Sequence, residues 1–126
     1  GMTEEFFQKY PWIYEKELPD LYQIAKKEGL TIIQAHPFRP VCFPADPECL
    51  HGIEIFNGNP RHDSHNDLAR ALAEQAGLPG TAGSDFHQVQ DLASCCVGFE
   101  KLPRDGQELA EAIRQGRFTR EIFRGI

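Results

Sequence analysis

Hydrophobic residues in the segment 15–29 recur at helical spacing, with polar residues between them. Leu18, Leu21, Tyr22 and Ala25 fall on one face, and Gly29 follows. The pattern predicts a helix over 15–29 that glycine ends, because glycine readily adopts the left-handed conformation of a helix C-terminus. The same reasoning predicts two further helices, from Asp63 or Ser64 to Ala76 and from Asp105 to Gln115.

Short β-prone runs separate these helices. They predict strands at 31–35, 53–56, 81–84, 95–99 and 118–123. Four prolines are spread through residues 36–51, so that segment is predicted to be a long loop. Strands that alternate with helices are typical of an α/β domain, here with a parallel sheet of four or five strands and flanking helices.

The chain has 126 residues and a formal net charge of −6. This length predicts one domain over residues 2–126, with Gly1 interpreted as the remnant of a cleaved tag. Acidic residues outnumber basic ones, so the composition does not strongly indicate a protein that binds nucleic acid. No segment approaches the roughly 18 apolar residues of a membrane span, and the N-terminus lacks a signal-peptide pattern, so we expect a cytoplasmic protein.

Four cysteines do not indicate a disulfide scaffold in a chain of this size. Cys95 and Cys96 are adjacent in a predicted strand, so their side chains should point to opposite faces. Cys42 and Cys49 lie near His51 in the proline-rich loop, which leaves open a zinc-binding loop, although the usual Cys-x-x-Cys spacing is missing.

Candidate metal ligands follow two of the predicted strands. His36 comes after the first strand, and Asp85 and His87 come after the third. The carboxyl ends of parallel strands meet at one rim, where sites of such folds gather. Pro37 should hold His36 extended. In an extended segment Asp85 and His87 would face the same way, as ligands of one metal or of two neighbouring metals.

Two arginines also follow predicted strands and could clamp a phosphate group. Arg39 follows the first strand and Arg61 follows the second, with Asn57 close by. A surface ion pair is the alternative role for each arginine. Ser84 next to Asp85 does not indicate a serine hydrolase, because the chain has no Gly-x-Ser-x-Gly motif.

Three segments taken in order resemble the C-terminal half of the PHP superfamily, the metal-dependent phosphoesterases named after polymerases and histidinol phosphatase. The segments are 35–39 (AHPFR), 53–58 (IEIFNG) and 82–87 (AGSDFH). The similarity extends from about residue 30 to Arg117 and is most specific in the Gly-Ser-Asp-x-His element. It implies a truncated form of the family's distorted β/α barrel.

The resemblance also implies roles for individual residues. His36, Asp85 and His87 would bind divalent metal ions, whether zinc, manganese, iron or magnesium. Arg39 would meet substrate phosphate, and Glu54 and Asn57 match the family pattern. With the candidates taken from the residues themselves, the expected substrate contacts are Arg39, Asn57 and Arg61, and Glu54 and Ser84 are expected to support the site. The family's opening His-x-His motif has no counterpart, and residues 2–30 contain no histidine. A catalytic zinc normally takes about three protein ligands, so the site is expected to be incomplete in one chain.

Closed β/α barrels have at least about 200 residues, so this chain has room for only part of one. A partial barrel exposes strand edges and apolar surface, which predicts a homodimer. The leading hypothesis is a phosphoesterase that hydrolyses a phosphorylated small molecule or nucleotide through metal-activated water. The alternatives are a non-catalytic PHP remnant, acting as a metal-binding or protein-interaction module, and a Cys/His zinc module around residues 42–51.

Overall fold

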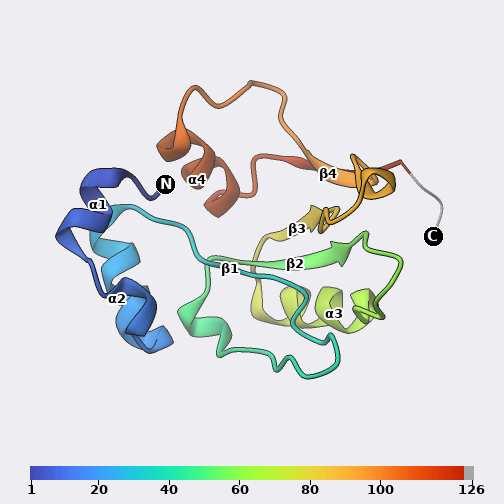
Figure 1. Cartoon of the computed structure of the whole chain (residues 1–126), viewed down its shortest axis with the longest axis horizontal. Helices are drawn as coiled ribbons and strands as arrows, with labels where there is room; N and C mark the ends of the chain where they lie inside the picture. The colour runs from blue at the N-terminus through green and yellow to red at the C-terminus, as the bar shows by residue number, and fades with distance from the viewer. Residues whose placement is uncertain (124–126) are drawn as a thin grey trace.

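The computed structural model describes residues 1–123 and shows a mixed α/β architecture (Figure 1). The predicted domain, 2–126, includes three residues that lie outside this described part. The helices are α1 (Glu4–Lys9), α2 (Leu18–Glu28), α3 (Asn66–Ala76) and α4 (Gly106–Arg114). The strands are β1 (Ile33–Gln34), β2 (Gly52–Asn57), β3 (Gly80–Gly83), β4 (Cys95–Gly98) and β5 (Thr119–Ile122). Short 3₁₀ turns occupy Ile13–Glu15, Pro47–Cys49 and Val89–Asp91.

Three strands form a parallel sheet in the order β1-β2-β3, and β4 pairs with β5 in a separate antiparallel ribbon. The prediction of four or five parallel strands was therefore wrong for the last two. Parallel strands are normally buried on both faces, whereas every residue of β5 is exposed. In Figure 1 the arrows of β2 and β3 point the same way, so their carboxyl ends share one side of the sheet.

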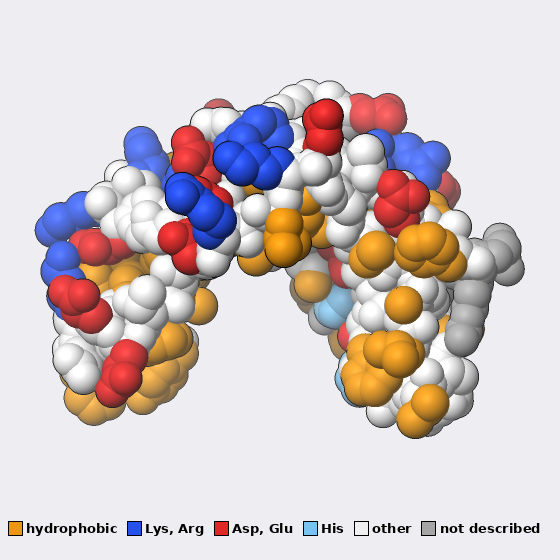
Figure 2. Space-filling model, turned by 90° about the horizontal axis from the view of Figure 1, so that it is seen from above, with side chains coloured by type: hydrophobic (Ala, Val, Ile, Leu, Met, Phe, Trp, Pro, Cys, Tyr) orange, Lys and Arg blue, Asp and Glu red, His pale blue; other side chains and the backbone are white. Residues whose placement is uncertain are grey.

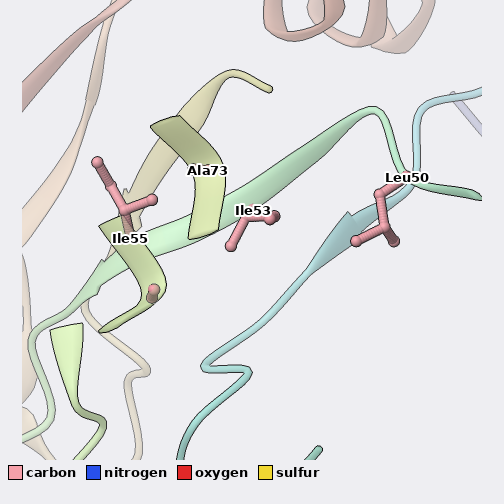
Figure 3. Packing of buried hydrophobic residues seen from close by; sticks show 5 residues of the cluster. Leu50, Ile53, Ile55 and Ala73 are labelled. Carbon is pink, nitrogen blue, oxygen red and sulfur yellow. The ribbon is translucent and has the colours of Figure 1, made fainter. Parts of the chain in front are cut away.

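The main core lies between β2 and α3. Ile53 and Ile55 of β2 pack with Leu50 and with Ala69 and Ala73 of α3 (Figure 3). The two alanines have small side chains, which lets the helix approach the strand closely. A second cluster joins α1 to α2 through Phe6, Ile13, Ala25 and Leu30. The two clusters place α3 against the sheet and the N-terminal helices to one side of it.

Some helix boundaries differ from the predicted ones. The pattern did not predict α1, which begins where the Thr3 hydroxyl accepts a hydrogen bond from the Phe6 amide at 3.2 Å. The second helix begins at Leu18 rather than at residue 15, because residues 13–15 form a 3₁₀ turn and Lys16 is extended. Gly29 and Gly77 end their helices with φ of 69° and 67°, as predicted.

The start of α3 is set by a contact with the sheet. Neither Asp63 nor Ser64 is the N-cap, because the helix begins at Asn66 and His65 precedes it in the left-handed conformation. The Asn66 side chain accepts a hydrogen bond from the Asn57 amide at 2.9 Å and donates to the Asn57 carbonyl at 3.2 Å. This pair of bonds joins the first turn of the helix to the end of β2.

Seen from above, the molecule is curved like an arch around a hollow. Hydrophobic side chains gather on both sides of this hollow, at the two ends of the arch (Figure 2). Large apolar side chains that are exposed include Phe7, Trp12, Tyr14, Val41, Phe43, Phe86, Val89, Leu92, Leu102 and Phe123. None of the helices in residues 1–123 has the length and apolar composition of a bilayer-spanning segment.

Candidate functional site at the strand ends

A connected network of polar side chains lies at the carboxyl ends of the parallel strands. Glu54 of β2 is at its centre, and its Oε2 accepts hydrogen bonds from the His36 amide at 2.9 Å and from Asn57 Nδ2 at 3.0 Å. Its Oε1 lies 2.7 Å from the place where a Cβ at position 83 would be. Gly83, the last residue of β3, therefore leaves room for the Glu54 carboxylate.

Arg39 joins this network to the loop after β3. Its Nη2 donates to Asp85 Oδ2 at 2.8 Å, to Asn57 Oδ1 at 2.9 Å and to Ser64 Oγ at 3.1 Å. The Arg39 side chain is only 13% exposed, and its Nε is buried with no hydrogen-bond partner among the described residues. Burial disfavours the charged Asp85 carboxylate, but the hydrogen bond and charge of Arg39 outweigh burial and hold the pKa of Asp85 below its usual value.

Asp85 and His87 lie side by side, although not for the predicted reason. The backbone at Asp85 is left-handed, with φ of 50°, so the prediction of an extended segment was wrong. The turn places His87 Nδ1 2.8 Å from the Asp85 carbonyl oxygen and 3.5 Å from Asp85 Oδ1. A carbonyl oxygen only accepts, so in a neutral imidazole this contact requires the proton on Nδ1 and leaves Nε2 with a lone pair. The imidazole is largely exposed to solvent.

The His36 backbone also differs from the prediction. Its φ is 29°, so the segment before Pro37 is not extended. The amide of His36 donates to Glu54, and its carbonyl accepts from the Arg39 amide at 3.1 Å, so the chain turns directly after β1. The imidazole Nδ1 lies 3.7 Å from Cys42 Sγ. This histidine joins the network through its main chain, while its ring contacts a cysteine in the loop.

Arg61 forms a second arginine–carboxylate pair with Asp91, a residue that sequence reasoning missed. The guanidinium donates to both Asp91 oxygens, at 2.9 and 2.6 Å. The fully buried carboxylate also accepts from the backbone amides of His87 at 3.0 Å and Gln88 at 2.8 Å. The Arg61 hydrogen bonds outweigh burial and hold the pKa of Asp91 well below its usual value. The pair therefore holds in place the loop that carries Asp85 and His87.

Two further polar residues complete the rim. Asn59 Nδ2 donates to the Asp85 carbonyl oxygen at 3.3 Å, a contact that no sequence pattern indicated. Ser84, predicted as a supporting residue, is half-buried directly after β3.

The residues at the rim do not by themselves fit a metal ion. Within residues 1–123, no three His, Cys, Asp or Glu side chains are grouped so that they could hold one. Asp85 is bonded to Arg39, and the His36 ring contacts Cys42. The alternative zinc loop is not assembled either, because His51 Nδ1 accepts from the Ile32 amide at 3.0 Å and its ring lies against Tyr22.

Comparison with known families identifies one part of the chain. Residues 63–118 match the family model PHP_C, described as PHP-associated. Neither the curated proteins nor the solved structures gave a match. The matched segment includes α3, β3, β4 and α4, and it contains Asp85, His87 and Asp91. The match therefore supports a PHP-superfamily C-terminal region over residues 63–118.

Proposed function

We propose that this chain supplies the C-terminal part of a PHP-type phosphoesterase site, formed on a portion of a β/α barrel. The observation that carries the proposal is the polar network at the ends of β1, β2 and β3, which joins Glu54, Asn57, Arg39 and Asp85 at one rim. The family match over Asp85 and His87 supports the same conclusion. The substrate would be a phosphorylated small molecule or nucleotide, hydrolysed by a metal-activated water.

Asp85 and His87 are the pair best placed to contribute to a metal site. His87 Nδ1 lies 3.5 Å from the Asp85 carboxylate, and His87 Nε2 keeps its lone pair. A catalytic zinc takes about three protein ligands, so at least one more must come from another protein segment. His36 would need its ring to turn away from Cys42 before it could serve. A second copy of the chain is the simplest source of further ligands.

Metal content and phosphatase activity test this proposal on the full chain. The chain would be incubated with Mn²⁺ or Zn²⁺, dialysed, analysed by mass spectrometry and assayed on p-nitrophenyl phosphate. We expect the wild-type chain to retain metal and to hydrolyse the substrate. In Asp85→Ala, both the metal content and the rate of hydrolysis should be at least about tenfold lower. Asp63→Ala is the control, because the Asp63 carboxylate is exposed and bonds only to the neighbouring His65. A wild-type chain that retains no metal would refute the proposal.

One observation favours a second candidate, a non-catalytic module that binds another protein. Arg39 already neutralises Asp85 at 2.8 Å, so this carboxylate has a counter-charge without a metal ion. The exposed apolar side chains of the arch offer surface for a partner. For such a module we expect no hydrolysis and the same melting temperature with and without Mn²⁺.

A further inference from the structure

We propose that His51 acts as a pH-sensitive switch at the junction between the N-terminal helices and the parallel sheet. In its neutral form the imidazole accepts a hydrogen bond from the Ile32 amide, directly before β1. Protonation of the ring removes that acceptor and loosens the junction. The inference is independent of the proposed function, because neither residue belongs to the polar network at the rim.

The hydrogen bond between Ile32 and His51 fixes the protonation state of the ring. His51 Nδ1 lies 3.0 Å from the Ile32 nitrogen. A backbone amide only donates, so Nδ1 must offer a lone pair, and the proton of the neutral ring is on Nε2. In the charged ring both nitrogens carry a hydrogen, and Nδ1–H would face the Ile32 N–H. A bond that only the neutral form can make disfavours protonation.

The bond lies where the two apolar clusters meet. Ile32 packs against the cluster between β2 and α3 and also against the cluster that joins α1 to α2. Its carbonyl accepts from the amides of His51 at 2.8 Å and Gly52 at 3.2 Å, and protonation leaves these two bonds intact. Loss of the imidazole acceptor removes the bond to the Ile32 N–H alone. We therefore expect a local opening of the junction rather than unfolding of the whole chain.

Two helices place aromatic and positively charged groups around the ring. The half-buried imidazole lies against Tyr22 of α2, with ring centroids 5.0 Å apart. From α4, Arg114 Nη1 donates to the Leu30 carbonyl at 3.3 Å, close to the same junction. Burial, followed by the positive charges of Arg114 and of Lys26 on α2, lowers the pKa of His51 below its usual value.

The remaining titratable groups belong to the turn before His51. Asp46 and Glu48 are exposed and line a groove with Tyr22, and Cys49 ends the 3₁₀ turn. Within residues 1–123, no carboxylate forms an ion pair with His51. A protonated ring would therefore have two cations near it and no paired carboxylate to compensate its charge.

The direction of the pH effect follows from the lowered pKa. A histidine in the opened segment has a pKa of about 6.5, so protons bind to the open form first. The contribution of His51 to the closed junction is fully present above about pH 6.5. It is lost as the pH falls below that value through the lower pKa of the closed form.

Amide hydrogen exchange measured by NMR on the full chain tests the inference. Between about pH 7.5 and pH 5.5, we expect the protection factor of the Ile32 amide to fall at least about threefold. In His51→Asn it should stay constant, because the asparagine side-chain oxygen accepts without titrating in this range. His62→Asn is the matched control, since it removes an exposed histidine and should keep the pH dependence of the wild-type chain.

Three results would overturn the inference. The first is a protection factor of Ile32 that does not fall in the wild-type chain, and the second is an equal fall in His51→Asn. The third does not depend on a variant that folds. Imidazole nitrogen shifts of the wild-type chain report the state of the ring, so a His51 that titrates at or above about pH 6.5, or carries its neutral-form proton on Nδ1, contradicts the assigned bond.

Discussion

Two carboxylates follow β3, and each is bonded to an arginine from the loop after an earlier strand. Asp85 pairs with Arg39 from the loop after β1, and Asp91 pairs with Arg61 from the loop after β2. The two pairs differ in how fully the carboxylate is satisfied. The Asp85 carboxylate is partly exposed and lies next to the His87 imidazole. The Asp91 carboxylate is buried, and both of its oxygens accept hydrogen bonds. We infer that the second pair maintains the structure of the loop that carries His87 and Gln88.

Replacement of Asp91 by asparagine should destabilise the protein. The change removes the negative charge of the buried carboxylate that accepts hydrogen bonds from Arg61 and from two backbone amides. A buried pair that loses one partner is strongly destabilised, and we expect the melting temperature to fall by at least about 5 °C. Glu108→Gln is the control, because the Arg104–Glu108 pair is a surface i,i+4 pair, of a kind that contributes little. Equal effects of the two changes in a thermal melt would contradict the assigned role.

The dependence of stability on pH checks the same assignment. The pKa of Asp91 is lower in the folded chain than the value near 4 that an unfolded chain has. Its contribution to stability is therefore present above about pH 5 and is lost as the pH falls below that. Asp91→Asn should lose less of its unfolding free energy on acidification than the wild-type chain does.

At the scale of single residues, the sequence predicts which residues lie at the rim, but it does not predict their backbone conformations. Strand order and the carboxyl-end rule were enough to select Arg39, Asn57 and Asp85. The positive φ at His36 and Asp85 could not be predicted, because the contacts made there come from distant parts of the chain, such as Glu54 and Asn59. Asp91 was missed because no periodic pattern surrounds it.

At the scale of elements, local capping signals predicted some boundaries and tertiary contacts set others. Asp105, from which this helix was predicted to run, is the N-cap of α4 and accepts a hydrogen bond from the Glu108 amide at 2.8 Å. Asp63 has a similar position in the sequence, yet α3 begins at Asn66, which is bonded to the end of β2. The antiparallel pairing of β4 with β5 was not predictable from the alternation of strands and helices, because that pattern is also typical of parallel sheets.

The two aspartates should therefore differ when each is replaced by alanine. Asp105→Ala removes a side-chain cap, which costs about 1 kcal/mol of unfolding free energy. Asp63→Ala removes only a bond to the His65 amide outside the helix, so we expect a smaller loss. Urea denaturation of both variants measures the difference. A larger loss for Asp63→Ala would mean that Asp63, and not the contact with β2, fixes the start of α3.

At the scale of the whole molecule, we consider the small parallel sheet, the apolar surface beside it and the ligands available at the rim. The sheet has three parallel strands, and β1 forms an edge of only two residues. Beside it lies a groove of about 440 Å³, lined largely by apolar side chains such as Phe7, Ile13, Tyr14 and Ile33. Among the residues that the structure describes, the rim lacks the grouped ligands that a metal needs. A second copy that covered the groove would bury its apolar surface.

We therefore expect the chain to form a homodimer through this groove. A stable interface buries about 1,200–2,000 Å² in total, and a charge placed in its centre is costly. Tyr14 is 75% exposed and lines the groove, so Tyr14→Glu should shift the chain toward monomer in size-exclusion chromatography with light scattering. Leu102→Glu is the matched control, because Leu102 is 81% exposed and lies outside the groove. A wild-type chain that is monomeric at micromolar concentration would refute the dimer, and equal dissociation by both variants would place its interface elsewhere.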